Sequence, residues 1–231
     1  TGNHATDQAI GVVFVSEGTF TLTDCWFHDN SIQSTPIYVM FGGCSMIGGL
    51  GGISSPTEII IRDSIFEDNA NYNGYGGANS AYNTFVDGSI SMEVSNCTFR
   101  HNKAGYGGAI AGRGSSEKVN VIMKIKDCTF TDNEAFGGGA IHASSCTNVT
   151  VENCTITGSK AYDFADREDY HGEGGGAIII MAYSKGTVRD CTIKDSYAEL
   201  SGGAIQVFAF SELTMEDTVV SKSEAESHAG A

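Results

Sequence analysis

Acidic residues of this sequence are arranged in two ways that could serve a metal site or a pair of catalytic carboxylates. The first is the segment 160–174, where five acidic residues fall close together: Asp163, Asp166, Glu168, Asp169 and Glu173. Carboxylates on a loop are suitable oxygen ligands for calcium, so we predict a candidate calcium site there. Because the spacing matches neither an EF-hand nor a glycine-rich calcium repeat, the alternative is an acidic, solvated loop.

The second place is an acidic column that recurs along the chain. An Asp or Asn precedes each of seven similar phrases, CWFHDN, SIFEDN, CTFRHN, CTFTDN, CTITGS, CTIKDS and TVVSKS. The column consists of Asp24, Asp63, Asn96, Asp127, Asn153, Asp190 and Asp217. Paired carboxylates could hydrolyse a polysaccharide. An active site is not repeated seven times, however, whereas Asp and Asn tolerate the unusual backbone angles of a bend. We therefore predict corners and no catalytic residue.

The elements that position these residues follow from the repeat. The first residue of each phrase is the anchor, and the seven anchors recur about every 32 residues at Cys25, Ser64, Cys97, Cys128, Cys154, Cys191 and Thr218. The residue three positions before each anchor is apolar, as is the residue two positions after it. Alternation with period two predicts two short strands that meet at the Asp/Asn corner.

Two further columns complete each repeat. Asn30, Asn69, Asn102 and Asn133 stand three positions after the Phe of the first four phrases, where stacked amides can form a hydrogen-bonded ladder. A glycine pair follows, in GGAN at 76–79 and in GGAI beginning at 107, 138, 175 and 202. Glycine permits a tight corner, so a third strand is expected after it.

The repeat therefore predicts an all-β chain, a right-handed single-stranded parallel β-helix like the pectate-lyase solenoids. We expect about seven coils with three short strands each, and take the handedness from the general preference of crossover connections. Residues 1–231 form one domain, with loop insertions near 38–57, 79–88 and 160–174. The segment is expected to be excised from a longer repeat array.

The positions of the cysteines predict buried free thiols at most sites and few disulfide bonds. The anchor column holds Cys25, Cys97, Cys128, Cys154 and Cys191, and Ser and Thr also occupy it, which indicates a small buried position. We predict stacked free thiols there. Cys44 and Cys146 lie off the column and are the candidates for disulfide pairing. Because no CxxC spacing occurs, a zinc site is not expected.

The net charge and the predicted surface residues restrict the classes of molecule that this chain is expected to bind. The net charge is -15, which argues against nucleic acid and against an anionic membrane surface. No apolar run is long enough to cross a bilayer, so we expect no membrane insertion by this segment. Sequons at Asn96, Asn148 and Asn153 are candidate glycosylation sites. A column of outward threonines, Thr98, Thr129, Thr155 and Thr192, leaves a ligand-binding face open as an alternative.

The alternation of FxxN with GGAI resembles the repeat of the chlamydial polymorphic outer-membrane proteins and of similar surface proteins in protists. FxxN stands complete at 27–30, 66–69, 99–102 and 130–133, although the last three copies carry Ser in place of Asn. The resemblance implies a β-helical passenger exposed at a cell surface, with adhesive roles in the bacterial relatives.

Together these patterns favour the structural or adhesive shaft of an extracellular or cell-surface protein. Its expected partners are other copies or further coils stacked end to end, glycans, and host or cell-surface proteins. No cofactor is predicted apart from the calcium candidate. The alternative is a polysaccharide-binding or polysaccharide-cleaving β-helix, but we do not expect an enzyme, because no singular set of catalytic residues stands out.

Overall fold

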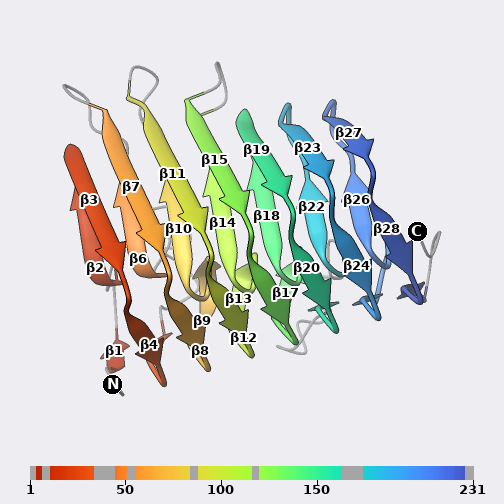
Figure 1. The fold of residues 1–231 in the computed structure, drawn as a ribbon, viewed down its shortest axis with the longest axis horizontal. Coiled ribbons are helices and arrows are strands. Elements are labelled where there is room, and N and C mark those ends of the chain that lie inside the picture. Colours follow the sequence, from red (N-terminus) through yellow and green to blue (C-terminus); the bar gives the residue numbers. More distant parts are fainter. Residues whose placement is uncertain are drawn as a thin grey trace.

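The computed structural model describes residues 4–6, 11–33, 45–50, 56–83, 88–115, 120–162 and 174–226. They form a stack of coils in which like strands of successive coils lie side by side (Figure 1). All the strand pairs are parallel, and they build four sheets, which we call A, B, C and D. Within the described part, no helix has the length and hydropathy to span a membrane.

Sheets C and D hold the two strands on either side of the Asp/Asn corner. Sheet C contains β3 (Gly18–Thr23), β7 (Thr57–Arg62), β11 (Ile90–Ser95), β15 (Val121–Lys126), β19 (Thr147–Glu152), β23 (Lys185–Arg189) and β27 (Glu212–Glu216). Sheet D contains β4 (Trp26–His28), β8 (Ile65–Glu67), β12 (Thr98–Arg100), β16 (Thr129–Thr131), β20 (Thr155–Thr157), β24 (Thr192–Lys194) and β28 (Val219–Ser221).

Sheets A and B hold the strands on either side of the glycine pair. Sheet A contains β1 (His4–Thr6), β5 (Ser31–Gln33), β9 (Ala70–Tyr75), β13 (Lys103–Tyr106), β17 (Glu134–Gly137), β21 (Lys160–Ala161), β25 (Tyr197–Ala198) and β29 (Glu224–Ala225). Sheet B contains β2 (Gly11–Ser16), β6 (Ser45–Leu50), β10 (Asn79–Tyr82), β14 (Ile110–Arg113), β18 (Ile141–Ser144), β22 (Ile178–Ile180) and β26 (Ile205–Val207).

Each full coil therefore carries four strands, and the expectation of three was wrong. The strand that sequence reasoning missed belongs to sheet A and follows the Asn column. In β13 it reads Lys-Ala-Gly-Tyr, which is too short and too rich in small residues to show an apolar alternation. It forms because strands of the coils on both sides offer it backbone partners.

All three predicted loop insertions contain residues that form strands. Residues 79–82 form β10 and residues 45–50 form β6, so both belong to sheet B and are not loop. The glycines of SMIGGL hide the second of these strands in the sequence. From the segment 160–174, residues 160 and 161 form β21, while 163–173 lie outside the described residues.

The core is a set of columns that run along the axis inside the coils. Strands of sheet C alternate buried and outward side chains, as in β15, so one face of each is apolar and faces inward. The rings of Phe27, Phe66, Phe99 and Phe130 stack in one such column, with centroids 5.4, 5.0 and 4.9 Å apart. Stacking at one ring per coil matches the register of successive strands in sheet D.

Candidate functional site

The Asp/Asn column lies at the sharp corner between sheets C and D. All seven residues have positive φ, between 44° and 55°. Asn and Asp adopt this left-handed conformation more readily than other non-glycine residues, so the corner explains why only these two types appear there. The Nδ2 amides of Asn96 and Asn153 donate to carboxylates of the adjacent coils, Asp63 and Asp127, at 2.6 Å each. The predicted corners are confirmed.

Side chains of the anchor column, which follows the corner, both accept and donate a hydrogen bond. The backbone N–H of Cys128 donates to Sγ of Cys154, and the N–H of Cys154 donates to Sγ of Cys191, at 3.4 and 3.5 Å. Each thiol in turn donates to the carbonyl two residues earlier, at 3.1 Å for Cys128 and Cys154. Hydroxyls can do both, which explains Ser64 and Thr218 at the same position.

These cysteines are free, as predicted. Cys97, Cys128, Cys154 and Cys191 are buried, and Cys25 is half-buried. Hydrogen bonds with the neighbouring thiols, together with burial, raise the pKa of the Cys128 thiol above its ordinary range. Cys146, a candidate for pairing, is also free and buried, while Cys44 lies outside the described residues.

The predicted asparagine ladder is present, and its amides form hydrogen bonds from coil to coil in the buried interior. The Nδ2 amide of each Asn donates to Oδ1 of the Asn in the following coil, at 2.9 Å from Asn30 and 3.0 Å from Asn69 and Asn102. The Nδ2 of Asn102 also donates to the carbonyl of Phe66 at 3.0 Å. The ladder stops at Ser159, whose buried hydroxyl has no hydrogen-bond partner.

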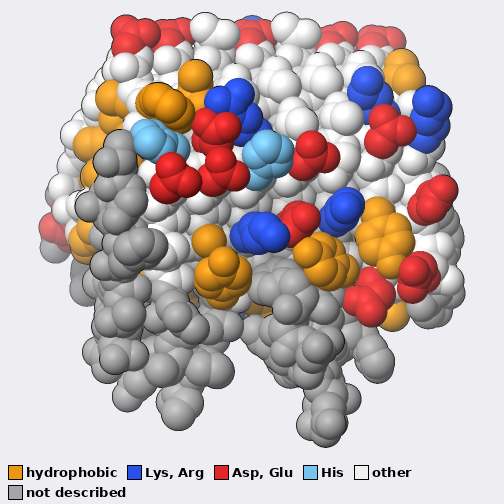
Figure 2. All heavy atoms as spheres, turned by 90° about the horizontal axis from the view of Figure 1, so that it is seen from below, with side chains coloured by type: hydrophobic (Ala, Val, Ile, Leu, Met, Phe, Trp, Pro, Cys, Tyr) orange, Lys and Arg blue, Asp and Glu red, His pale blue; other side chains and the backbone are white. Residues whose placement is uncertain are grey.

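A second corner, between sheets D and A, was not predicted. Its residues also have positive φ, and they are Asp29, Asp68, His101, Asp132, Gly158, Asp195 and Lys222. This position of the repeat holds Asp, His, Gly or Lys, so no shared residue type marks the corner in the sequence. The outward side chains of this corner form rows of charge along one side of the molecule (Figure 2).

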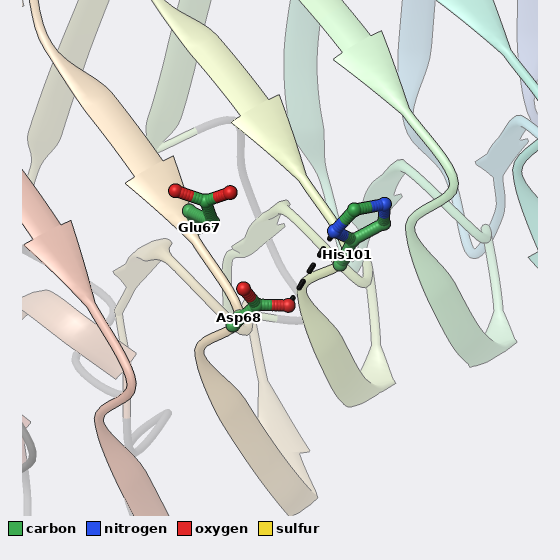
Figure 3. A group of neighbouring side chains, drawn as sticks. All are labelled: Glu67, Asp68 and His101. Carbon is green, nitrogen blue, oxygen red and sulfur yellow. Dashed lines mark ion pairs between the residues drawn. The ribbon is translucent and has the colours of Figure 1, made fainter.

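At this corner, Glu67, Asp68 and His101 lie together on adjacent coils (Figure 3). One ligand atom from each lies within 4.8 Å of the others, and Nδ1 of His101 is 3.4 Å from Asp68 Oδ1. Both oxygens of Glu67 face Arg100, which lies 2.5 Å away through Nε and 2.7 Å through Nη2. A metal ion would therefore have to displace Arg100 from Glu67.

The chemistry of this cluster follows from that pairing. The hydrogen bond from Arg100 lowers the pKa of Glu67, so this carboxyl stays ionised and does not hold a proton to donate near neutral pH. The cluster is a partly exposed ion-pair network at a corner.

A groove lies on the outer side of sheet A. It has a volume of about 480 Å³ and is lined by Lys160, Tyr162, Tyr197 and Glu199. Tyr162 donates its hydroxyl to Glu134 Oε2 at 2.9 Å, and Lys103 lies 2.7 Å from the same carboxylate oxygen. Burial raises the pKa of Glu134, but the bonds from Lys103 and Tyr162 outweigh it and hold the pKa below its usual value.

The predicted site residues fall in different places. The calcium candidates Asp163, Asp166, Glu168, Asp169 and Glu173 lie outside the described residues. Asn96 and Asn153 are exposed at corners, and Asn148 is half-buried on the outer face of sheet C. The threonine column is in register on sheet D, with Thr129, Thr155 and Thr192 exposed. Within the described residues, the three asparagines and the threonine column lie at different places and do not form a single site.

Comparison with known proteins concerns the fold alone. Residues 84–229 match the family described as "Right handed beta helix region", which is more than half of the chain. No curated protein and no solved structure matches it. Four parallel sheets wound from consecutive strands are the architecture that this description names. The chain therefore belongs to the right-handed beta helix family.

Proposed function

We propose that this chain is a rigid stretch of shaft in a structural or adhesive protein at the cell surface or outside the cell. The proposal is supported by the continuity of the interior, where thiol, phenylalanine and asparagine columns pass from coil to coil. A solenoid whose coils repeat the same contacts holds distant parts at a fixed separation. The resemblance of the FxxN and GGAI phrases to surface proteins supports the location.

The observation that carries the proposal is the use made of the recurring polar residues. Asn102 donates through Nδ2 to Asn133 and to the Phe66 carbonyl, and its Oδ1 accepts from Asn69. Asp63 accepts from Asn96, and Glu67 is held by Arg100. Residue types that could do chemistry are thus engaged in holding coils together.

An assay of polysaccharide cleavage tests the shaft against an enzyme. The purified protein is incubated with acidic polysaccharides, with and without calcium, and the chain length of the polysaccharide is followed. We expect no change in length under either condition. Cleavage that depends on the protein would overturn the shaft proposal.

We also propose that two copies of this chain stack end to end. The support is that β27 and β28 are edge strands of sheets C and D, and that Met215, in register with the buried Val188, is 42% exposed at the end of the stack. Edge strands carry unpaired backbone groups that another strand can satisfy. Electron microscopy at high protein concentration should show rods longer than one molecule. Dispersed short rods would count against copies that stack.

A second candidate function, polysaccharide binding, is favoured by the groove on sheet A. Tyr162 and Tyr197 offer ring faces on which a sugar ring can stack, and Lys160 and Glu199 can exchange hydrogen bonds with hydroxyls. The test is retention on immobilised polysaccharides. We expect Tyr197→Ala to lose retention, while Tyr183→Ala, an exposed tyrosine elsewhere, keeps it. Equal retention of the two variants would contradict binding in this groove.

A further inference from the structure

The guanidinium of Arg113 occupies an unusual position on the outer face of sheet B. Arg113 ends β14, and its register neighbours in adjacent coils are Tyr82 and Ser144. The guanidinium carbon lies 5.3 Å from the ring centre of Tyr75 and 5.7 Å from that of Tyr82, and Nη1 donates to the Tyr75 hydroxyl. The side chain is half-buried against this aromatic wall.

Arg113 lacks the kind of partner that other basic residues have. Arg100 pairs with Glu67, Arg189 with Glu152, and Lys103 with Glu134, at 2.5 to 2.7 Å. In the described part of the chain, no carboxylate lies within ion-pair distance of Arg113, although acidic residues outnumber basic ones by 28 to 13. Among the described arginines, Arg62 also has no carboxylate within ion-pair distance, but Arg62 is exposed whereas Arg113 is half-buried.

The contacts with tyrosine satisfy this guanidinium only in part. It has five N–H donors in a planar fork, and the Tyr75 hydroxyl takes one of them. The ring faces stabilise the positive charge but accept no strong hydrogen bond. Burying part of a cation whose N–H donors lack acceptors raises the free energy of the folded state, unless a further acceptor reaches those donors.

A second polar group beside Arg113 is also unsatisfied. His142 is 1% exposed, and its Nδ1 has no hydrogen-bond partner. The His142 ring lies 5.6 Å from the Tyr75 ring and 5.1 Å from the Tyr106 ring, so it belongs to the same cluster. A buried polar atom without a partner is uncommon in folded proteins, and it marks this cluster independently of the charge on Arg113.

We propose that Arg113 anchors a binding site for the carboxylate group of a small acidic ligand, a sugar acid or an amino-acid derivative. The planar fork of arginine fits a carboxylate through two parallel N–H···O bonds. Tyr75 and Tyr82 hold the guanidinium in place and form the wall of the site. The site lies on a single coil and its two neighbours, and it goes beyond the shaft role, because a shaft does not require it.

Thermal unfolding and calorimetry with two acids test the proposal. The full chain is titrated at pH 7 and constant ionic strength with D-glucuronate and with N-acetylglycine, and with methyl glucoside as the uncharged sugar. We expect at least one acid to raise Tm and methyl glucoside to leave it unchanged. A preference between the acids identifies whether a sugar or an amino-acid frame carries the carboxylate.

Variants decide whether Arg113 is responsible. We expect Arg113→Gln to weaken the apparent Kd about ten-fold or more, because it removes a charge-assisted bidentate contact. Arg189→Gln, which changes an exposed arginine elsewhere, should bind as the parent does. If Arg113→Gln does not fold, Arg113→Lys keeps the charge, loses the fork and should still bind less tightly. Binding of neither acid, or equal binding by the parent and the Arg113 variants, overturns the proposal.

Discussion

Asn69 donates its side-chain amide to Oδ1 of Asn102 across a coil boundary at 3.0 Å, and its backbone N–H donates to the same oxygen at 3.2 Å. One amide oxygen therefore satisfies two donors of the preceding coil. Both residues are fully buried, so no water can replace these bonds. The ladder links coils by polar contacts where the Phe column links them by apolar ones.

Removing Asn102 should be costly. Asn102→Ala leaves the backbone N–H of Asn69 and one N–H of its side-chain amide without an acceptor, and it removes the Nδ2 donor from the Phe66 carbonyl. Each unsatisfied buried group costs about 1 to 3 kcal/mol. We expect the free energy of unfolding to fall by about 3 to 5 kcal/mol. Denaturant unfolding followed by circular dichroism measures it. The exposed Thr129→Ala is the control, with an expected change within about 0.5 kcal/mol.

The ladder should be extensible by one rung. Ser159 follows Asn133 in the column, is fully buried, and has an unpartnered hydroxyl. In Ser159→Asn, the new amide oxygen can accept from Asn133 as Asn133 now accepts from Asn102. We expect a gain of about 1 kcal/mol in the free energy of unfolding, whereas exposed Ser221→Asn should change little. A lower denaturation midpoint for Ser159→Asn would show that the column cannot take a further amide.

The buried side chain of Asn79 is expected to destabilise the folded state. Asn79 occupies the position that Ile110 holds in the next coil, is 0% exposed, and has no partner for either side-chain polar atom. Asn79→Ile should raise the free energy of unfolding by about 2 kcal/mol. Asn83→Ile is the matched control, because Asn83 is buried but donates to the Gly88 carbonyl at 2.7 Å. It should destabilise, and a similar effect of both substitutions would refute this explanation.

Acid should weaken the Arg113 cluster through His142. Burial, with the nearby charge of Arg113, lowers the pKa of His142 from 6.5 to about 3. A base with a depressed folded-state pKa contributes stability above pH 6.5 that is lost as the pH falls towards 3, at about 1.4 kcal/mol per pH unit.

His142→Ala isolates this effect, because Ala111 occupies the same position in the preceding coil. Unfolding is measured between pH 7 and pH 3 for the parent and the variant. We expect the parent to lose more stability over this range than His142→Ala, and the exposed Thr129→Ala, which changes no titratable group, to behave as the parent does. Identical pH profiles of the parent and His142→Ala would contradict a neutral, buried His142.

Residues that recur in register were predictable from the sequence. The same structural requirement recurs in every coil, and it selects the same residue types at the same position of each repeat. Examples are the corner at Asp63 and Asn96, the ladder at Asn69 and Asn102, and the thiols at Cys128 and Cys154. Such a recurrence is visible in the sequence without a structure.

Features that depend on one coil or on distant pairs could not be read in this way. Strand β13 exists because its neighbours pair with it, and its own residues do not favour a strand. Tyr75, Arg113 and His142 meet only after three coils stack, because 67 residues separate the first from the last. The groove at Tyr162 and Tyr197 likewise joins adjacent coils on the outside of the rod, where sequence columns vary.

Removing one coil tests whether the coils are interchangeable structural units. Deleting residues 97–127 joins Asn96 to Cys128, so one corner and CTF phrase replace another in register. Small-angle X-ray scattering and thermal unfolding of the deletion variant are the measurement. We predict a folded rod of unchanged cross-section, shorter by about 4.8 Å, that still unfolds cooperatively. An unfolded or collapsed variant would show that the coils are not interchangeable.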